Sequence, residues 1–217
     1  VTGVQTCALP IYSPEYADLA KATLPSRRAY CRKHGYHLHV QTIPLSDRGL
    51  NWDKLVLLSR ALQSADIVVW NGADVVFMNL DFKLESIFDQ FPNHPVILST
   101  DVYGINSDNM IFRKSPWSEQ FLYALNTLGY ALYRNHPWRE QEAIIRFASA
   151  PPYIDKIAYA PQNLMNSYLN DLYGRPTSWP GHYQEGDWLI HLPGIPNEQR
   201  IDVINNRLGV KKHSAMP

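Results

Sequence analysis

The sequence predicts an α/β fold built as a single domain around a central, mostly parallel β-sheet. Short apolar segments alternate with longer amphipathic ones, which is the order of strands and helices in α/β proteins. One short segment, residues 65–70 (ADIVVW), is mainly apolar, as strands buried on both faces of a parallel sheet are. The chain has 217 residues, 45% of them hydrophobic, which is enough for one domain with a substantial core.

The expected helices are identified by capping residues, prolines and apolar spacing. Ser13 and Pro14 combine a capping hydroxyl with a proline at the first helical position, so a helix is expected from there to residue 34, with Gly35 as its stop. The same signals, or apolar residues at helical spacing, predict further helices over residues 52–63, 115–128, 137–148 and 196–208.

The expected strands are short and rich in β-branched and aromatic residues. Besides residues 65–70, strands are expected over residues 36–43, 95–99, 109–113, 154–160 and 188–192. Residues 162–186 are polar and contain two prolines and three glycines, which predicts a long loop. Loops of that length are usually functional or disordered.

The charge balance argues against one class of function. The chain has 20 Lys and Arg against 20 Asp and Glu, a net charge of zero, whereas general nucleic-acid binders carry a basic excess. Its longest apolar runs, such as residues 67–70, are far shorter than the ~18 residues of a membrane span. We therefore expect no general nucleic-acid binding and no transmembrane segment in this stretch of sequence.

The first eleven residues differ in character from the rest. Residues 1–11 (VTGVQTCALPI) resemble the translation of a common sequencing adapter, and they lack the basic region of a signal peptide. We interpret residues 1–11 as an artefact and residues 12–217 as a domain truncated at its N-terminus, with its first strand missing. The alternative is that the segment is a genuine short first strand.

Two residues near the ends of predicted strands are candidate metal ligands. Asp74 follows strand 65–70 and lies at the carboxyl edge of the sheet, where ligands bind in doubly wound folds. His191 lies on strand 188–192 and points away from the face of its two neighbours. Each residue alone has a simpler explanation. Asp74 would be a carboxylate that accepts backbone hydrogen bonds in a turn, and His191 would be a buried, hydrogen-bonded histidine. If the two meet, their oxygen and nitrogen ligands suit a divalent cation such as manganese.

Several segments, taken in order, resemble one enzyme family. They are residues 30–38 (YCRKHGYHL), 52–55 (WDKL), 70–79 (WNGADVVFMN), 101–113 (DVYGINSDNMIFR), 138–143 (WREQEA) and 183–194 (YQEGDWLIHLPG). In these the chain is similar to the retaining GT-A glycosyltransferases of family 34, which include yeast α-galactosyl- and α-mannosyltransferases and plant xyloglucan xylosyltransferases. The resemblance spans residues 12–207 and implies a GT-A, Rossmann-like fold.

The resemblance implies transfer of a hexose, with retention of configuration, from a nucleoside-diphosphate sugar to a carbohydrate or glycoconjugate acceptor. A UDP-sugar is the preferred donor and GDP-mannose the alternative. The family holds Mn²⁺, or alternatively Mg²⁺, with an Asp-x-Asp motif and a late histidine, which match Asp74 and His191. Gly72 occupies the position of the first aspartate. A water or Asn71 must therefore substitute for that carboxylate, or metal binding is weakened.

The resemblance also assigns further residues. The candidate catalytic residues are Gln141, Glu140 and Asp101. The candidate substrate-binding residues are Lys54, Gly104, Asn106, Arg113 and Gly194. Of these, Lys54 and Arg113 are expected to contact phosphate, and Gly194 matches a turn that meets the diphosphate. The wider group often has a lysine three residues after this glycine, where this chain has Asn197. Simpler explanations exist for most of these residues. Glu140 and Gln141 would lie on a helix surface, and Asp101, Gly104 and Asn106 in a polar turn. Lys54 and Arg113 would be solvated surface charges.

Two other functions remain open. Gly72 and the expected loss of the first strand also fit a catalytically weak or inactive relic that binds nucleotide sugars. Asp74 and His191 also fit a metal-dependent phosphohydrolase, although such sites usually contain a denser cluster of carboxylates. The localisation stays open as well: a bacterial or viral protein of this kind is expected in the cytoplasm, whereas a Golgi-type anchor would precede residue 12.

Overall fold

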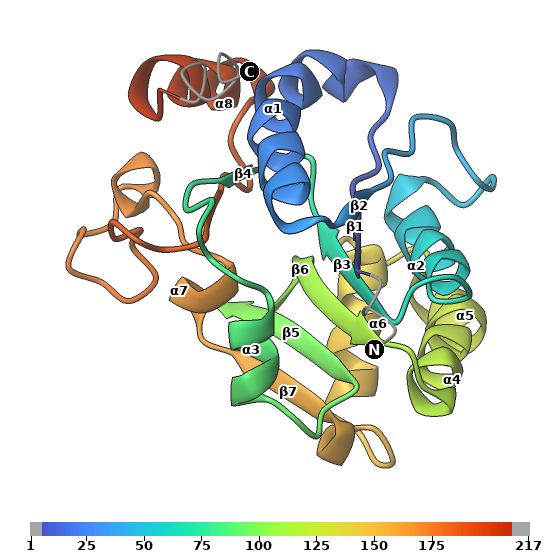
Figure 1. The fold of residues 1–217 in the computed structure, drawn as a ribbon. Helices are drawn as coiled ribbons and strands as arrows, with labels where there is room; N and C mark the ends of the chain where they lie inside the picture. The colour runs from blue at the N-terminus through green and yellow to red at the C-terminus, as the bar shows by residue number, and fades with distance from the viewer. Residues whose placement is uncertain (1–5, 210–217) are drawn as a thin grey trace.

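The computed structural model describes residues 6–209, which form helices around a six-stranded β-sheet (Figure 1). The sheet has the strand order β2-β1-β3-β6-β5-β7. Its strands are β1 (Thr6–Leu9), β2 (His37–Leu38), β3 (Ile67–Asn71), β5 (Val96–Asp101), β6 (Gly104–Arg113) and β7 (Ile157–Ala160). A second, two-stranded sheet consists of β4 (Val75–Phe77) and β8 (Leu189–His191). The α/β class predicted from the sequence is confirmed.

The helices cover both faces of the large sheet. They are α1 (Ala17–His34), α2 (Leu50–Ala61), α3 (Glu85–Gln90), α4 (Pro116–Ala124), α5 (Tyr130–Tyr133), α6 (Arg139–Ala148), α7 (Gln162–Met165) and α8 (Asn197–Asp202). Because side chains alternate along a strand, Val68 and Trp70 of β3 pack in a core with α2, α4 and α6. Ile67 and Val69 pack on the other face with α1, α3 and β4. The sheet is therefore the middle of three layers.

The large sheet is mostly parallel, as predicted, and it is mixed because one of its strands, β6, runs in the opposite direction. Strand β1 is parallel to β2 and to β3, and β5 is parallel to β7. Strand β6 is antiparallel to both of its neighbours. The reason is the connection between β5 and β6, which contains only Val102 and Tyr103. A turn this short reverses the chain and cannot hold the crossover that parallel strands need.

The first strand is present, so the prediction that it is missing is wrong. Residues 6–9 form β1 in the interior of the sheet, in register with His37 and Leu38 on one side and with residues 67–70 on the other. Ile11, which follows the strand, is 7% exposed and belongs to the core of the α2 layer. The origin of residues 1–11 is a separate question from their place in the fold.

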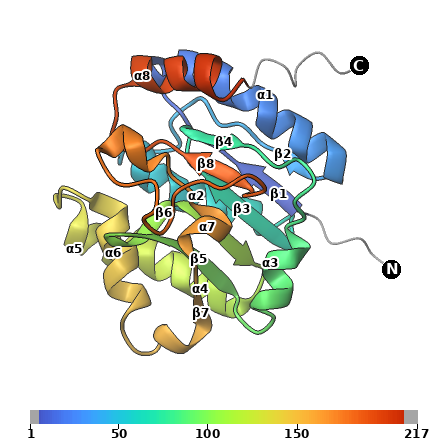
Figure 2. The same ribbon diagram turned by 90° about the vertical axis from the view of Figure 1, so that its left-hand side faces the viewer.

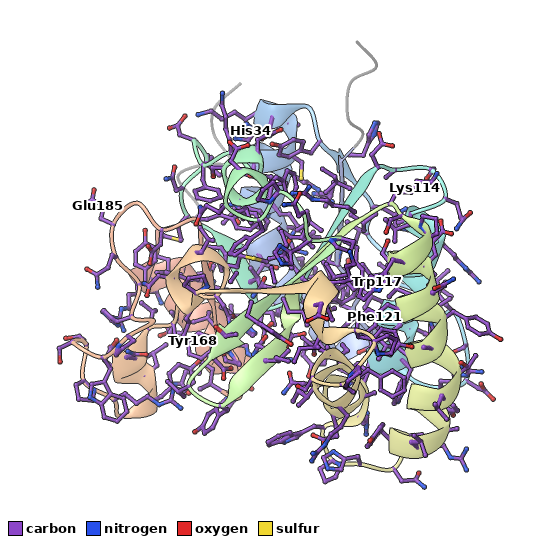
Figure 3. All side chains as sticks on the ribbon, turned by 90° about the horizontal axis from the view of Figure 1, so that it is seen from below. His34, Lys114, Trp117, Phe121, Tyr168 and Glu185 are labelled. Atoms are coloured by element: carbon purple, nitrogen blue, oxygen red, sulfur yellow. The ribbon has the colours of Figure 1, made fainter. Side chains whose placement is uncertain are left out.

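The helix predictions are largely confirmed, and three local features were missed. Helix α1 ends at Gly35, whose φ of 70° is the left-handed conformation of a helix cap. Strand β4 and helix α3 were not predicted. The segment 162–186, predicted as a loop, contains α7 and buries Met165, Tyr168 and Leu169. Figure 3 shows Tyr168 in this segment beside the β5–β6 hairpin.

The small sheet lies between α1 and the large sheet (Figure 2). Its strands are antiparallel, with Val75 opposite His191 and Phe77 opposite Leu189. Val76 and Ile190 pack with Leu19 of α1 and with the end of the α8 region. This arrangement brings a segment just after β3 against a segment near the end of the chain. Within residues 6–209, no helix combines the length and the apolar character that crossing a membrane requires.

Candidate active site

Asp74 and His191 come together at the small sheet. Val75, directly after Asp74, is the register partner of His191. The backbone N–H of Leu192 donates to the carbonyl of Asp74 at 3.1 Å, which extends the pairing by one residue. As a result, Asp74 Oδ1 lies 3.4 Å from His191 Nε2. The structure therefore places the two side chains predicted from the sequence in one site.

A third residue, Asp108 of β6, completes this cluster. Ligand atoms of Asp74, Asp108 and His191 all lie within 4.8 Å of one another. Asp108 Oδ2 is 3.7 Å from His191 Nε2. Asp108 was not predicted, because its approach to the cluster depends on the antiparallel pairing of β3 with β6. The backbone N–H of Gly72 continues that pairing by donating to the carbonyl of Asp108 at 2.7 Å.

The imidazole of His191 is fully buried and held by a chain of amides. Nδ1–H donates to Asn166 Oδ1 at 2.8 Å. The same oxygen accepts from Asn109 Nδ2 at 3.0 Å, and Asn109 Oδ1 accepts from Asn71 Nδ2 at 2.8 Å. Nε2 has no hydrogen-bond partner. With the proton on Nδ1, the lone pair of Nε2 faces the two carboxylates and is available to a cation.

The electrostatics of the cluster favour a positive charge at its centre. Burial on its own lowers the pKa of His191, but the carboxylates of Asp74 and Asp108 raise it, and the net direction is upward. Burial raises the pKa of Asp74, while His191 and Arg200 lower it, and the net direction is downward. The carboxylate of Asp74 therefore stays ionised and attracts either a proton on the imidazole or a metal ion.

Asn71, suggested as a substitute for the first aspartate, has a buried Oδ1 without a hydrogen-bond partner. Its side chain is fully buried, and its amide belongs to the chain that ends at His191. It is also absent from the residues that line the cleft in front of the cluster. His191 is equally buried and is likewise absent from that lining, so substitution of the first aspartate by Asn71 stays a prediction.

Two arginines hold the loop that carries Asp74. Arg27 of α1 is buried and donates to the carbonyl oxygens of Gly72 at 2.8 Å and of Val75 at 3.4 Å. Burial lowers its pKa to about 10, so the guanidinium stays charged at neutral pH. Arg200 of α8 is 2.9 Å from Asp74 Oδ2. Neither arginine was predicted, because no local motif relates α1 or α8 to the end of β3.

A cleft of about 340 Å³ opens in front of the metal-ligand cluster. The site residues that line it are Tyr12, Tyr16, Lys54, Gly72, Asp74, Ser107, Asp108, Glu140, Gln141, Gly194 and Arg200. They come from the beginning, the middle and the end of the chain. The carboxyl end of β3 and the hairpin strand β6 meet here, which is the edge at which α/β sheets bind ligands.

Lys54 lies in the wall of this cleft as part of a buried ion network. Its ammonium is 2.9 Å from Glu140 Oε1 and 3.2 Å from Asp108 Oδ1. It also donates to the carbonyl and the hydroxyl of Ser107 at 3.1 Å each. Burial lowers the pKa of Lys54, but the two carboxylates raise it, and the net direction is upward. The lysine predicted as a phosphate contact therefore also neutralises the acids around it.

The predicted residues Glu140, Gln141 and Gly194 all line the cleft. Glu140 Oε2 is buried and has no hydrogen-bond partner, although its other oxygen binds Lys54. Gln141 Oε1 accepts from the backbone N–H of Ser107 at 3.1 Å. Gly194 has a φ of 69°, a left-handed conformation that favours glycine, and forms the turn after β8.

Three predicted residues lie in the β5–β6 hairpin and do not line the cleft. Asp101 pairs with Gly104 across the turn. Asp101 Oδ2 accepts from Tyr168 Oη at 2.7 Å and from Asn106 Nδ2 at 3.1 Å. Asn106 Oδ1 in turn accepts from the backbone N–H of Asp108 at 2.9 Å. The geometry shows these residues supporting the strand that carries Asp108.

Arg113 lies away from the site, contrary to its predicted phosphate contact. It is the register partner of Ile67, at the opposite end of β3 from Asn71, which places it about 13 Å along the strand. Its guanidinium donates to the carbonyl oxygens of Phe88, Phe91 and Pro92. Arg113 therefore caps the carboxyl end of α3.

Comparisons with known proteins place this geometry in a family. The model of the galactosyl transferase GMA12/MNN10 family matches residues 88–202. An uncharacterized alpha-1,2-galactosyltransferase of Schizosaccharomyces pombe is 23% identical over 247 residues, which cover 93% of this chain and 71% of the yeast protein. Probable glycosyltransferase 6 of Oryza sativa subsp. japonica is 29% identical over 121 residues, covering 50% of this chain and 25% of the rice protein.

A solved structure supports the fold independently. It is that of a glycosyltransferase involved in the glycosylation of the major capsid of PBCV-1, with a TM-score of 0.76 and 16% identity. The match covers 93% of this chain and 98% of that one. At this identity the likeness shows the GT-A fold alone. Because the family model covers more than half of the residues, this chain belongs to the galactosyl transferase GMA12/MNN10 family and is a glycosyltransferase.

Proposed function

We propose that this protein transfers a hexose from a nucleoside-diphosphate sugar to a carbohydrate or glycoconjugate acceptor, in a reaction that depends on a divalent metal ion. The observation that carries the proposal is the buried Nε2 of His191, which has no hydrogen-bond partner and faces two carboxylates at the cleft. An unsatisfied polar atom in a buried position is costly unless a ligand satisfies it.

The side chains present fit such a metal ion. Asp74 and His191 offer one carboxylate and one imidazole, and Asp108 lies within reach of both. Oxygen and nitrogen ligands of this kind suit Mn²⁺, with Mg²⁺ as the alternative when more oxygens take part. A divalent cation in such a site neutralises the negative charge that develops on a diphosphate leaving group.

The other residues of the cleft have complementary roles in this proposal. Arg200 and the turn at Gly194 lie beside Asp74 and offer a cation and backbone N–H groups to the diphosphate. Glu140 Oε2, which lacks a partner, is the acceptor for a hydroxyl of the donor sugar. Gln141 lies next to it and is the candidate oxygen near the anomeric carbon in a retaining reaction.

Nucleotide release is the direct test. The protein is incubated with Mn²⁺ and a panel of UDP- and GDP-sugars, with and without EDTA, and free nucleotide is measured. We expect release with at least one donor, with a UDP-hexose preferred, and its loss in EDTA and in Asp74→Ala. Absence of metal-dependent release with every donor contradicts the proposal.

The same samples separate the other two functions. Thermal stabilisation by UDP and Mn²⁺ without turnover indicates a binding relic. Release of phosphate from simple phosphate esters indicates a phosphohydrolase. Within residues 6–209 the metal-ligand cluster holds only two carboxylates and one imidazole, a smaller acidic set than hydrolysis of that kind usually employs.

A further inference from the structure

Gly72 is small for a reason of space and not of backbone conformation. Its φ lies outside the left-handed range that excludes other residues. A Cβ atom added at this position, however, would lie 2.8 Å from Asp74 Oδ1 and 3.2 Å from both Cβ and Cγ of Asp108. Real Cβ atoms essentially never approach another atom to 2.8 Å. The carboxylates of Asp74 and Asp108 therefore fill the space into which a side chain at position 72 would extend.

Positions 72 and 108 face each other across two strands. Gly72 follows β3, and its N–H donates to the carbonyl of Asp108 on β6. A side chain from either position therefore enters the same volume beside Asp74, and there is room for one of them.

The two oxygens of the Asp108 carboxylate have different neighbours. Its Oδ1 is held by the ammonium of Lys54 at 3.2 Å, and its Oδ2 lies 3.7 Å from the free Nε2 of His191. Its side chain is 37% exposed, so it opens to the cleft, whereas the ring of His191 is buried. One oxygen is thus fixed by the protein and the other is directed at the cluster.

We infer that Asp108 of β6 supplies the divalent-cation ligand that the chain lacks at position 72. The carboxylate comes from the neighbouring strand but occupies the same place in the site. This inference rests on the proposed metal dependence and names the residues that hold the ion. It assigns to Gly72 the role of leaving room for Asp108, and it means that the glycine does not mark an inactivated metal site.

A reciprocal exchange tests the inference. Four proteins are compared: the unaltered chain, Asp108→Gly, Gly72→Asp, and the double variant Gly72→Asp/Asp108→Gly. The dissociation constant of Mn²⁺ is measured by calorimetry and by the electron paramagnetic resonance of free Mn²⁺, and the melting temperature is measured without metal. Neither readout depends on enzymatic turnover.

We expect Asp108→Gly to weaken Mn²⁺ binding at least 10-fold. Gly72→Asp alone forces a third carboxylate into occupied space, so we expect it to lower the melting temperature and to weaken Mn²⁺ binding. The double variant replaces one carboxylate by another in the same volume, and we expect its affinity to return to within about threefold of the unaltered chain. Asp89→Asn, at an exposed acid on α3, serves as the control and should bind Mn²⁺ unchanged.

Two outcomes overturn the inference. One is unchanged Mn²⁺ affinity in Asp108→Gly, and the other is a folded double variant that binds Mn²⁺ no better than Asp108→Gly. If the double variant does not fold, Asp108→Asn decides, since it keeps the volume and removes the charge: retention of full affinity overturns the inference. Failure of the proposed function looks different, because Mn²⁺ then binds through Asp108 but no donor sugar is cleaved.

Discussion

The hydrogen bond between His191 Nδ1 and Asn166 Oδ1 fixes which nitrogen of the imidazole carries the proton. Partners of this kind, which touch a ligand and not the ion, typically change metal affinity 10–100-fold when they are removed. Asn166 also donates to the carbonyl of Thr100 at 3.2 Å, which orients its amide oxygen toward the imidazole. Asn166 is therefore a positioning residue for His191.

We expect Asn166→Leu to weaken Mn²⁺ binding 10–100-fold and to lower the free energy of unfolding by about 1–3 kcal/mol, because Nδ1 loses its acceptor in a buried place. Calorimetric titration with Mn²⁺ and denaturant unfolding provide the two values. Asn163→Leu, in α7 close by in sequence, is the matched control, since Asn163 binds His182 and Asp187 and does not contact the imidazole. Equal affinities in the two variants would show that Asn166 does not position His191.

Lys54 is a second residue whose effect is measurable on its own. It is 4% exposed and joins Glu140, which is 3% exposed, to Asp108. Removing one member of a buried ion pair leaves an uncompensated charge and typically costs about 3–5 kcal/mol. We expect a loss of that size in Lys54→Met, and a substantial recovery in Lys54→Met/Glu140→Gln, where the unpaired carboxylate is neutral.

Urea unfolding of the two single variants and the double variant yields the coupling between these residues. Lys156→Met, at an exposed lysine, is the control and should change stability by less than about 0.5 kcal/mol. A double variant as unstable as the sum of the single changes would mean that the pair does not interact. It would also remove the reason for treating Lys54 as the counter-ion of Glu140.

At the scale of single residues, the sequence located part of the site. Asp74 and His191 were predicted because each follows or lies on a recognisable short strand. Asp108 and Arg200 were not predicted, since their roles depend on contacts between elements that are distant in sequence. Arg113 was misassigned because a basic residue at the end of a strand has the same local pattern whether it binds phosphate or caps a helix.

Among the elements, α1 has a structural link to the active site through Arg27. Arg27 is 1% exposed, and its guanidinium donates to carbonyl oxygens at both ends of the turn between β3 and β4. The carbonyl of Gly72 also accepts from the backbone N–H of Val75 at 3.3 Å, so Arg27 and the turn share this acceptor. The helix thus holds the turn that carries Asp74.

We expect Arg27→Met to lower the free energy of unfolding by at least about 2 kcal/mol, because buried carbonyl oxygens lose their donor. It should also weaken Mn²⁺ binding, since Asp74 lies in the turn that Arg27 holds. Arg28→Met is the matched control on the exposed side of the same helix and should change stability by less than about 0.5 kcal/mol. Unfolding by urea and Mn²⁺ titration are the measurements, and equal behaviour of the two variants would contradict this role.

The elements found from the sequence are those with strong local signals. Helix α4 begins at Ser115 and Pro116, and the Ser115 side chain caps it by accepting from the N–H of Ser118, as the pattern predicts. Strand β4, with only three residues, was missed because its pairing with β8 comes from the folded chain. The direction of β6 was missed for a similar reason, since strand order and direction are set by connections and not by apolar patterns.

At the scale of the whole molecule, the main difference between the fold predicted from the sequence and the observed fold concerns the start of the chain. The resemblance of residues 1–11 to a translated sequencing adapter led to the prediction that they are an artefact, yet residues 6–9 occupy an interior position between β2 and β3. An interior strand contributes backbone hydrogen bonds on both sides. Its removal leaves two unpaired strand edges and exposes the core beside Ile11.

We expect a chain lacking residues 1–11 to lose cooperative unfolding and to aggregate, since β3 would have no partner on its β1 side. A chain in which residues 6–9 are replaced by an unrelated strand-forming tetrapeptide should keep a cooperative transition, because a good strand former restores the backbone pairing with β2 and β3. Thermal unfolding followed by circular dichroism compares the three proteins. If the shortened chain unfolds with the same cooperativity and melting temperature as the full chain, β1 is dispensable, and the four strands β3, β6, β5 and β7 form a stable sheet without it.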